Sequence, residues 1–258
     1  MTTASPAPRV DILGVEVSAI DMEEALTTIE SWIDAGERHY VCVNTVNSLL
    51  AALDDPELAE VYRRAGLVTP DGMPLVWISR WRGHPRVGRV YGPDLMLACC
   101  DRFRERGVRH YFYGGAEGVP EALTERLQAG YPGLEVVGSQ SPPFRPLTGD
   151  ELLRDIRRIN EASPDIVWVG LGAPKQDYWM AANIDRLEAP VLMGVGAAFD
   201  FHAGVKRQAP TWMRRNGLEW LFRFLTEPRR LAGRYIVGNS RFLALLAAEE
   251  LRRRTMRV

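Results

Sequence analysis

Short apolar runs alternate along this chain with helical stretches of about ten or more residues, and this alternation limits the fold more than any other feature. β-Branched and aromatic residues dominate runs at residues 39–43, 109–113, 134–138, 165–169 and 190–195. Most of these runs end at a glycine or an asparagine and lead into a sequence with helical periodicity. Strands and helices that alternate in this way form a mostly parallel sheet. We therefore predict the α/β class, with helices flanking the sheet.

Helices are predicted between these strands, at residues 21–35, 47–65, 119–129, 150–162 and 173–187. The first should begin at Asp21 as its N-cap, because Glu24 follows three residues later and completes a capping box. Residues 10–17 precede this helix as a short pair of strands.

The pattern changes after Pro210, which divides the chain into an α/β core at residues 1–210 and a helical appendage at 211–258. One apolar stripe with helical spacing runs along the start of the appendage, at Leu218, Leu221, Phe222 and Leu225. Pro228 should end that helix, and arginine-rich helical sequence follows. The stripe could enter a membrane interface or pack on the core or a second subunit, and the sequence leaves both open.

Charge separates the same two parts. Residues 214–258 hold eleven arginines and four glutamates, a charge of +7, so the rest of the chain sums to −8 within a net charge of −1. Such asymmetry predicts an anionic partner for the appendage. No apolar run reaches the ~18–20 residues of a membrane span, and the first eleven residues lack the pattern of a secretory signal. We expect a cytoplasmic protein without a nucleic-acid partner.

Several chemistries lack their motifs here. Three cysteines and four scattered histidines form neither a disulfide framework nor a zinc pattern. The chain contains no Asp-x-Asp triad, no phosphate loop of the form GxxxxGK[ST], and neither GxSxG nor HExxH. The common kinase, hydrolase and metalloprotease classes are therefore excluded.

Ligands of parallel α/β sheets bind beyond the carboxyl ends of the strands, so the loops there hold the candidate site. Thr69-Pro-Asp-Gly-Met-Pro74 is a tight turn that fixes the carboxylate of Asp71, which is a candidate catalytic group or a cap for the next helix. Asn44-Thr-Val-Asn47 offers amides and a hydroxyl to a sugar or a pyrophosphate, although Thr45 or Asn47 could equally cap a helix.

Three glycine loops could bring backbone close to a phosphate. They are Gly114-Gly-Ala-Glu-Gly118, Gly170-Leu-Gly-Ala-Pro-Lys175 and Gly194-Val-Gly-Ala-Ala-Phe199. The last two match only the first two glycines of GxGxxG, which is weak support for a dinucleotide. A helix N-terminus after each loop still favours an anion. Lys175 and Gln176 could add a charge and an amide, and Arg89 could bind a pyrophosphate or be a surface charge.

Read in order, these motifs resemble the WecG/TagA/CpsF family of bacterial glycosyltransferases. The resemblance rests on Asn44-Thr-Val-Asn47, Pro70-Asp-Gly72, Arg89 with Gly92-Pro-Asp94, Gly114-Gly115, Gly170-Leu-Gly-Ala-Pro-Lys-Gln176, Gly196-Ala-Ala-Phe-Asp200, and Gly217-Leu-Glu-Trp with Glu227-Pro-Arg-Arg230. It covers residues 10–235, nearly the whole chain.

The resemblance implies a Rossmann-like core whose appendage completes the active site and meets the membrane. It also implies inverting transfer of a sugar from a UDP-sugar to a polyprenyl-diphosphate-linked saccharide, at the inner face of the cell membrane, during surface polysaccharide synthesis. The family is thought to need no metal or other cofactor, which agrees with the missing Asp-x-Asp triad. The sequence leaves the donor, of N-acetylmannosamine or glucose type, and a homo-oligomer open.

Residue roles follow from the same resemblance. Asp71 matches the proposed catalytic base, and polar positions around the donor and acceptor match Thr45, Asn47, Arg89 and Gln176. Substrate contacts are also expected from Asn44, Gly114, Gly115, Gly172, Lys175, Asp200 and the appendage arginines Arg215, Arg223, Arg229 and Arg230. His202 and Pro142-Pro-Phe144 depart from the family pattern.

Two other classes of function stay open on the sequence. One is a Rossmann-type oxidoreductase or nucleotide-sugar-modifying enzyme, against which the incomplete glycine fingerprints count. The other is a non-catalytic scaffold whose basic appendage tethers a polysaccharide complex to the membrane.

Overall fold

The structure, a computed structural model, describes residues 7–226 and 228–255. Its centre is a six-stranded sheet in the order β4-β3-β8-β7-β5-β6, in which every neighbouring pair is parallel. The strands are β3 (His39–Asn44), β4 (Leu67–Pro70), β5 (Arg109–Gly114), β6 (Glu135–Gln140), β7 (Ile166–Gly170) and β8 (Val191–Gly194). The predicted α/β class with a mostly parallel sheet is confirmed.

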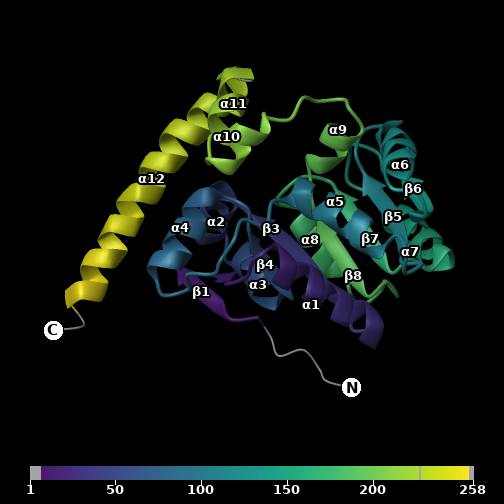
Figure 1. Cartoon of the computed structure of the whole chain (residues 1–258), viewed down its shortest axis with the longest axis horizontal. Coiled ribbons are helices and arrows are strands. Elements are labelled where there is room, and N and C mark those ends of the chain that lie inside the picture. The colour runs from purple at the N-terminus through teal and green to yellow at the C-terminus, as the bar shows by residue number, and fades with distance from the viewer. Residues whose placement is uncertain (1–6, 227, 256–258) are drawn as a thin grey trace.

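Helices cover both faces of this sheet (Figure 1), so strand residues point alternately into two buried clusters. One face is covered by α1 (Met22–Ala35), α5 (Gly92–Phe103), α6 (Val119–Gly130) and α9 (Ala198–His202). The other face is covered by α2 (Val46–Asp54), α3 (Pro56–Arg64), α4 (Met73–Trp81), α7 (Gly149–Ala162) and α8 (Lys175–Asn183). An antiparallel hairpin of β1 (Arg9–Ile12) and β2 (Val15–Ser18) packs on this second face.

Local sequence signals explain most helix boundaries. Asp21 caps α1 and forms the predicted capping box with Glu24. The single helix predicted at residues 47–65 is wrong, because α2 ends at Asp54 and α3 begins at Pro56. Proline disfavours helical backbone in the residue before it, so Asp55 becomes extended and caps α3 through its side chain.

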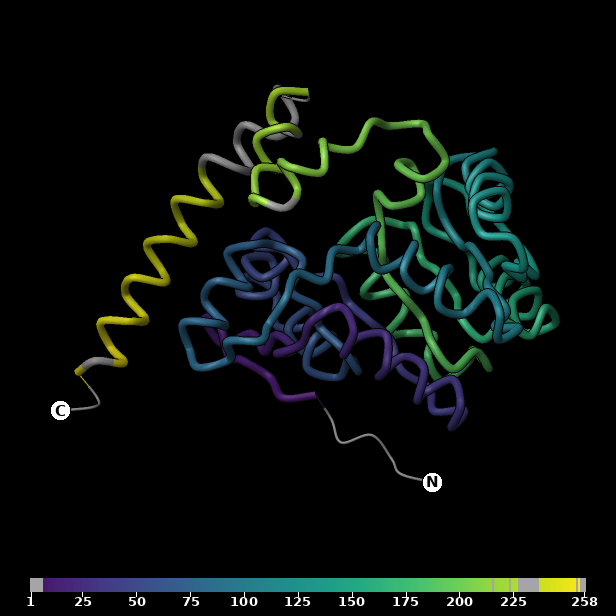
Figure 2. Tube along the Cα trace, in the orientation of Figure 1, coloured from purple at the N-terminus to yellow at the C-terminus, as the bar shows by residue number. Residues whose placement is uncertain are grey.

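The appendage contributes α10 (Thr211–Arg215), α11 (Glu219–Thr226) and α12 (Pro228–Thr255), and none of its described residues joins the sheet. Figure 2 shows the connection that leaves α9 and reaches α10 on the side of α2 and α4. From there α12 runs down the flank of the core (Figure 1). A domain boundary at residue 210 stays a prediction.

Ion pairs join α12 to the core at two places. Arg241 donates two hydrogen bonds of 2.6 Å to Asp54 at the end of α2. Arg82, just after α4, contacts both Glu249 and Glu250 at 2.7 Å. Of the predicted apolar stripe, Leu225 is exposed while the other three residues are half-buried. None of the helices in the described residues combines the length and apolar character that a bilayer crossing requires.

Candidate active site

The turns after β3 and β4 pack against each other and hold Asp71 at the carboxyl edge of the sheet. The backbone N–H of Asp71 donates to the carbonyl of Asn44 at 3.0 Å. Its side chain is nearly buried, with 8% of the residue exposed. The N-cap of α4 is Gly72, without a side-chain cap, so capping does not explain the carboxylate of Asp71.

Arg89 binds Asp71 at two points. Its Nη2 donates to Asp71 Oδ1 at 2.9 Å, and its Nε donates to the backbone carbonyl of the same residue. Its Nη1 donates to the carbonyl of Arg214, in α10, at 3.0 Å. Burial by itself lowers the pKa of Arg89, but the carboxylates of Asp71 and Glu219 outweigh it and raise that pKa above the usual range for arginine. Arg89 is therefore a permanent cation that links the turn to the appendage.

Glu219, the first residue of α11, is the second carboxylate on Arg89. Its Oε2 accepts from Arg89 Nη2 at 2.7 Å, and its Oε1 accepts from the hydroxyl of Tyr91 at 3.0 Å. Only 9% of Glu219 is exposed. The guanidinium carbon of Arg89 also lies 4.2 Å from the centre of the Tyr91 ring, a cation–π contact.

Sequence reasoning missed Glu219 and Tyr91 as site residues. Glu219 lies in a matched motif, Gly217-Leu-Glu-Trp, but it received no role there. The available signal was a lone acid at the start of an apolar helix, because a carboxylate buried on such a helix needs a cation to face it.

The β3 turn supplies three polar residues beside Asp71. Asn44 is fully buried, and within the described part of the chain neither its Oδ1 nor its Nδ2 has a hydrogen-bond partner. Thr45 is the N-cap of α2 and accepts from the N–H of Ser48, so its hydroxyl has the capping role. The Oδ1 of Asn47 lies 3.2 Å from the point where a Cβ on Gly238 would stand, so α12 passes directly over it.

Glycine loops continue the carboxyl edge of the sheet away from Asp71. At β7 and β5, the N–H of Gly115 donates to the carbonyl of Gly170 at 3.0 Å, and a Cβ on Gly114 would lie 2.6 Å from the carbonyl carbon of Gly170. The buried Gln176 accepts from the N–H of Gly172 at 3.1 Å. These glycines allow backbone and side chains to meet at distances that no Cβ would permit.

The other predicted binding residues lie in less enclosed positions. Lys175 is exposed at the first residue of α8. Asp200 pairs with Lys206 at 2.6 Å. Asp94 lies in the first turn of α5, whose N-cap is Tyr91, and it binds the guanidinium of Arg214. The side chains of Arg215, Arg223, Arg229 and Arg230 lie outside the described residues.

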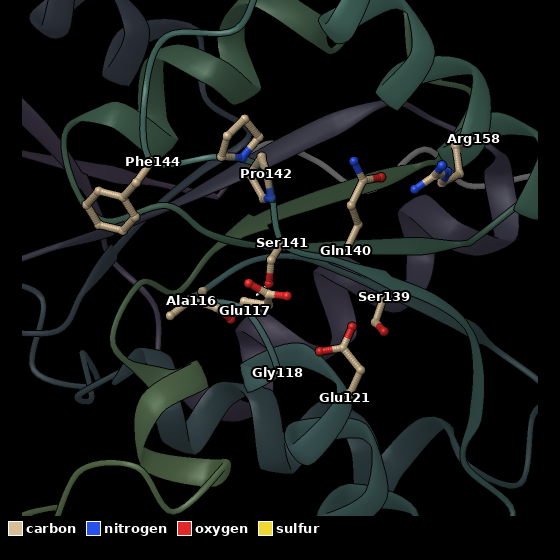
Figure 3. A pocket seen from close by; sticks show the side chains of 12 residues that line it. Ala116, Glu117, Gly118, Glu121, Ser139, Gln140, Ser141, Pro142, Phe144 and Arg158 are labelled. Atoms are coloured by element: carbon tan, nitrogen blue, oxygen red, sulfur yellow. Dashed lines mark hydrogen bonds between the residues drawn. The ribbon is translucent and has the colours of Figure 1, made fainter.

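A cavity of about 530 Å³ opens between the loop after β5 and the loop after β6. Figure 3 shows Glu117 and Glu121 on one wall and Gln140 and Arg158 on another. Phe144, at the rim, is 98% exposed. Oxygen atoms dominate the polar groups of this cavity, so it suits a ligand rich in hydroxyl or N–H donors.

The site residues thus lie in a row along one edge of the sheet. Four strand intervals of about 4.8 Å separate β4, which carries Asp71, from β5, which carries Gly114 and Gly115, a span of about 19 Å. Among the described residues, no group of three or more His, Cys, Asp or Glu side chains could hold a metal ion. The row can accept an extended, mostly anionic ligand. The carboxylate of Asp71 would face one end of that ligand.

Comparison with known proteins gives one family match and several relatives. The family model described as "Glycosyl transferase WecG/TagA/CpsF family" matches residues 10–256. A relative from Bacillus spizizenii is 28% identical over 204 residues, covering 78% of this chain and 76% of the relative. A relative from Staphylococcus aureus is 27% identical over 229 residues and covers 88% of each chain. Both are named N-acetylglucosaminyldiphosphoundecaprenol N-acetyl-beta-D-mannosaminyltransferase.

Proposed function

The chain belongs to the WecG/TagA/CpsF family of glycosyltransferases, and we propose that it transfers a sugar from a UDP-sugar to a polyprenyl-diphosphate-linked saccharide with inversion at the anomeric carbon. The names of the relatives support N-acetylmannosamine as the donor sugar, ahead of glucose, and a lipid-linked N-acetylglucosamine as the acceptor. Those names specify a β-linked product for the relatives, and the proposed UDP-sugar is α-linked, so the names support inversion at the anomeric carbon.

Asp71 carries this proposal, because it is a nearly buried carboxylate that Arg89 holds at two points. It lies at one end of the row of glycine loops, which could bind phosphate groups. Asp71 accepts the proton of an acceptor hydroxyl while that oxygen forms a bond to the anomeric carbon. The bond from that carbon to the diphosphate breaks, and UDP leaves with the electron pair. A positioned base of this kind contributes about 10²–10⁴-fold to the rate.

The charge of the departing diphosphate needs cations, and we assign that role to Lys175 and to the appendage arginines Arg215, Arg223, Arg229 and Arg230. Arg89 makes four hydrogen bonds, three of them to Asp71 and Glu219, so it suits the positioning of Asp71 better than the binding of a diphosphate. Arginine and lysine here replace the divalent metal that other glycosyltransferases hold with Asp-x-Asp. Activity should therefore persist in excess EDTA.

We assign the nucleoside to the cavity between the β5 and β6 loops. Glu117 and Glu121 would repel a diphosphate, whereas they can accept hydrogen bonds from ribose hydroxyls. The donor would then extend along the glycine loops, with its sugar towards Asp71. Asn44 is buried beside Asp71 without a partner in the described residues, so its amide would meet a sugar hydroxyl only after the turn that follows β3 opens.

The lipid-linked acceptor requires the Asp71 end of the site to meet a membrane. We propose that the basic appendage binds the anionic inner face of the cell membrane, since each arginine near such a surface is worth about 1 kcal/mol. The core is then a cytoplasmic body attached peripherally by α10–α12.

The deciding experiment compares the wild type with Asp71→Asn. UDP release is measured from UDP-N-acetylmannosamine and UDP-glucose, with a short-chain polyprenyl-diphosphate N-acetylglucosamine as the acceptor. The variant should bind UDP within about threefold of the wild type and lose at least about 100-fold in kcat. Asp150→Asn, an exposed position at the start of α7, is the matched control and should be fully active.

Three outcomes would count against the proposal. Turnover by Asp71→Asn at the wild-type rate would show that Asp71 is not the catalytic base. A thermal shift with NAD but none with UDP would favour an oxidoreductase, and the absence of any nucleotide-induced shift would favour a scaffold.

A further inference from the structure

We propose that Glu219 is a positioning residue for the reaction, an appendage carboxylate that holds Arg89 and through it sets the orientation and basicity of Asp71. This inference rests on the proposed function, because it concerns the same base. It adds that the core alone holds a weaker and less firmly oriented base, because Glu219 arrives with α11.

The hydrogen bonds of Arg89 carry the argument. A single nitrogen, Nη2, donates both to Asp71 Oδ1 at 2.9 Å and to Glu219 Oε2 at 2.7 Å. The guanidinium is planar and rigid, so a carboxylate that accepts a hydrogen bond from one of its nitrogens fixes the orientation of the whole group. Without Glu219, the only described appendage contact of the Arg89 guanidinium would be the backbone carbonyl of Arg214.

Glu219 is itself held firmly. Its second oxygen accepts from Tyr91, whose hydroxyl also accepts from the amide of Gln208 at 3.2 Å. The ring of Tyr91 lies against Arg89 at 4.2 Å. The carboxylate therefore has a fixed direction, which a surface ion pair would lack.

Charge gives the arrangement a measurable signature. Among the described residues, the charged and titratable groups around Asp71 come from three segments. The loop before α5 supplies Arg89 and Tyr91, α10 supplies Arg214, and α11 supplies Glu219. Arg214 is itself paired with Asp94 of α5. Arg89 is shared between two carboxylates. Removal of the charge of Glu219 leaves Arg89 to Asp71 alone, so Asp71 should hold its proton less tightly and become a weaker base.

The test is the pH dependence of kcat for Glu219→Gln, which keeps the shape of the side chain and removes its charge. The acidic limb of the profile should move down by about one pH unit. The plateau of kcat should fall about three- to tenfold because the base is weaker, with KM for the donor within about threefold. Glu219→Asp, which restores the charge, should return the limb towards its wild-type position.

Two companion variants separate charge from docking. Tyr91→Phe removes one hydrogen bond to Glu219 and no charge, so kcat should fall two- to fivefold without movement of the limb. The double variant Glu249→Gln/Glu250→Gln removes the carboxylates that Arg82 binds on α12, another appendage–core ion pair, and should leave the limb in place. Limited proteolysis in the segment at residues 203–210 reports whether the appendage stays docked in each variant.

A limb that stays in place or moves to higher pH in Glu219→Gln overturns the inference. An upward shift would mean that Arg89 has left Asp71, as simple loss of docking predicts. This failure is distinct from failure of the proposed function, which Asp71→Asn tests independently. An active Asp71→Asn would mean that no acidic limb of the pH profile can be assigned to Asp71. Should Glu219→Gln not fold, Glu219→Ala removes the same charge and provides the comparison, with Glu219→Asp as the variant that keeps the charge.

Discussion

The amide of Gln176 lies against the backbone of Gly194, and its Nε2 is 2.9 Å from the point where a Cβ at position 194 would stand. The same Cβ would lie 2.7 Å from the methyl carbon of Met180. Both neighbours are ends of flexible side chains, so Gly194→Ala should displace them rather than unfold the sheet. We expect a stability loss of about 1 kcal/mol and a tenfold loss of kcat/KM, because Gln176 leaves its position at Gly172.

Thermal melting and donor kinetics check this prediction together. Gly149→Ala is the matched control, because a Cβ there meets nothing within 4 Å at the start of α7. If Gly194→Ala lowers Tm but keeps full activity, Gln176 does not take part in binding the substrate.

Asp177 predicts a pH dependence of stability rather than of catalysis. It is 1% exposed, and burial raises its pKa to about 7, although hydrogen bonds from Cys42 and Tyr62 lower it. Between about pH 4 and pH 7 the unfolded chain has lost this proton while the folded chain keeps it. Ionisation of Asp177 therefore lowers the free energy of unfolding as pH rises through that window.

Asp177→Asn removes the ionisation. The difference in Tm between this variant and the wild type should increase in favour of the variant by about 5–10 °C between pH 5 and pH 8.5. Asp101→Asn, at an exposed position of α5, should show no such change. A difference that is the same at both pH values would mean that Asp177 does not titrate in this range.

The outer side of α12 offers a test of the proposed membrane contact. Val237, Leu243 and Leu251 are each about two-thirds exposed, at 65%, 64% and 65%, along the helix that runs down the flank of the core (Figure 1). Apolar residues beside arginines are typical of helices that lie in a membrane interface. Replacement of all three with serine should lower binding to anionic vesicles at least tenfold.

Vesicle flotation measures this binding, and turnover with a short-chain acceptor should remain within twofold of the wild type. Leu153→Ser, an exposed leucine on α7 in the core, is the control and should bind vesicles normally. Unchanged flotation of the triple variant would show that this side of α12 does not contact the membrane.

Local signals in the sequence were enough to predict the class of fold and the tight turn that carries Asp71. Periodicity identified the parallel strands, and turn chemistry identified Asp71 on a rigid loop. The helix predicted at residues 47–65 failed because the apolar pattern continues through Asp55 while Pro56 breaks the backbone. The strand order was not predictable, since β3 and β8 pair across most of the chain.

The partners of Asp71 show why the rest of the site was out of reach. Arg89 was recognised as a candidate, but nothing in its neighbourhood along the chain indicates that it faces two carboxylates. Glu219 reaches Arg89 only because the appendage returns over the carboxyl edge of the sheet. Contacts between residues so far apart in sequence have no periodicity that a single sequence could display.

The span of about 19 Å between the ends of β4 and β5 has a consequence for how the reaction would finish. In the proposed arrangement, with the nucleoside at the β5–β6 cavity and the lipid at the β4 edge, the two products would depart in opposite directions. UDP would escape into the aqueous phase, and the extended glycolipid would diffuse away within the bilayer. Neither exit route would cross the other, so the enzyme would be able to stay on the membrane between turnovers.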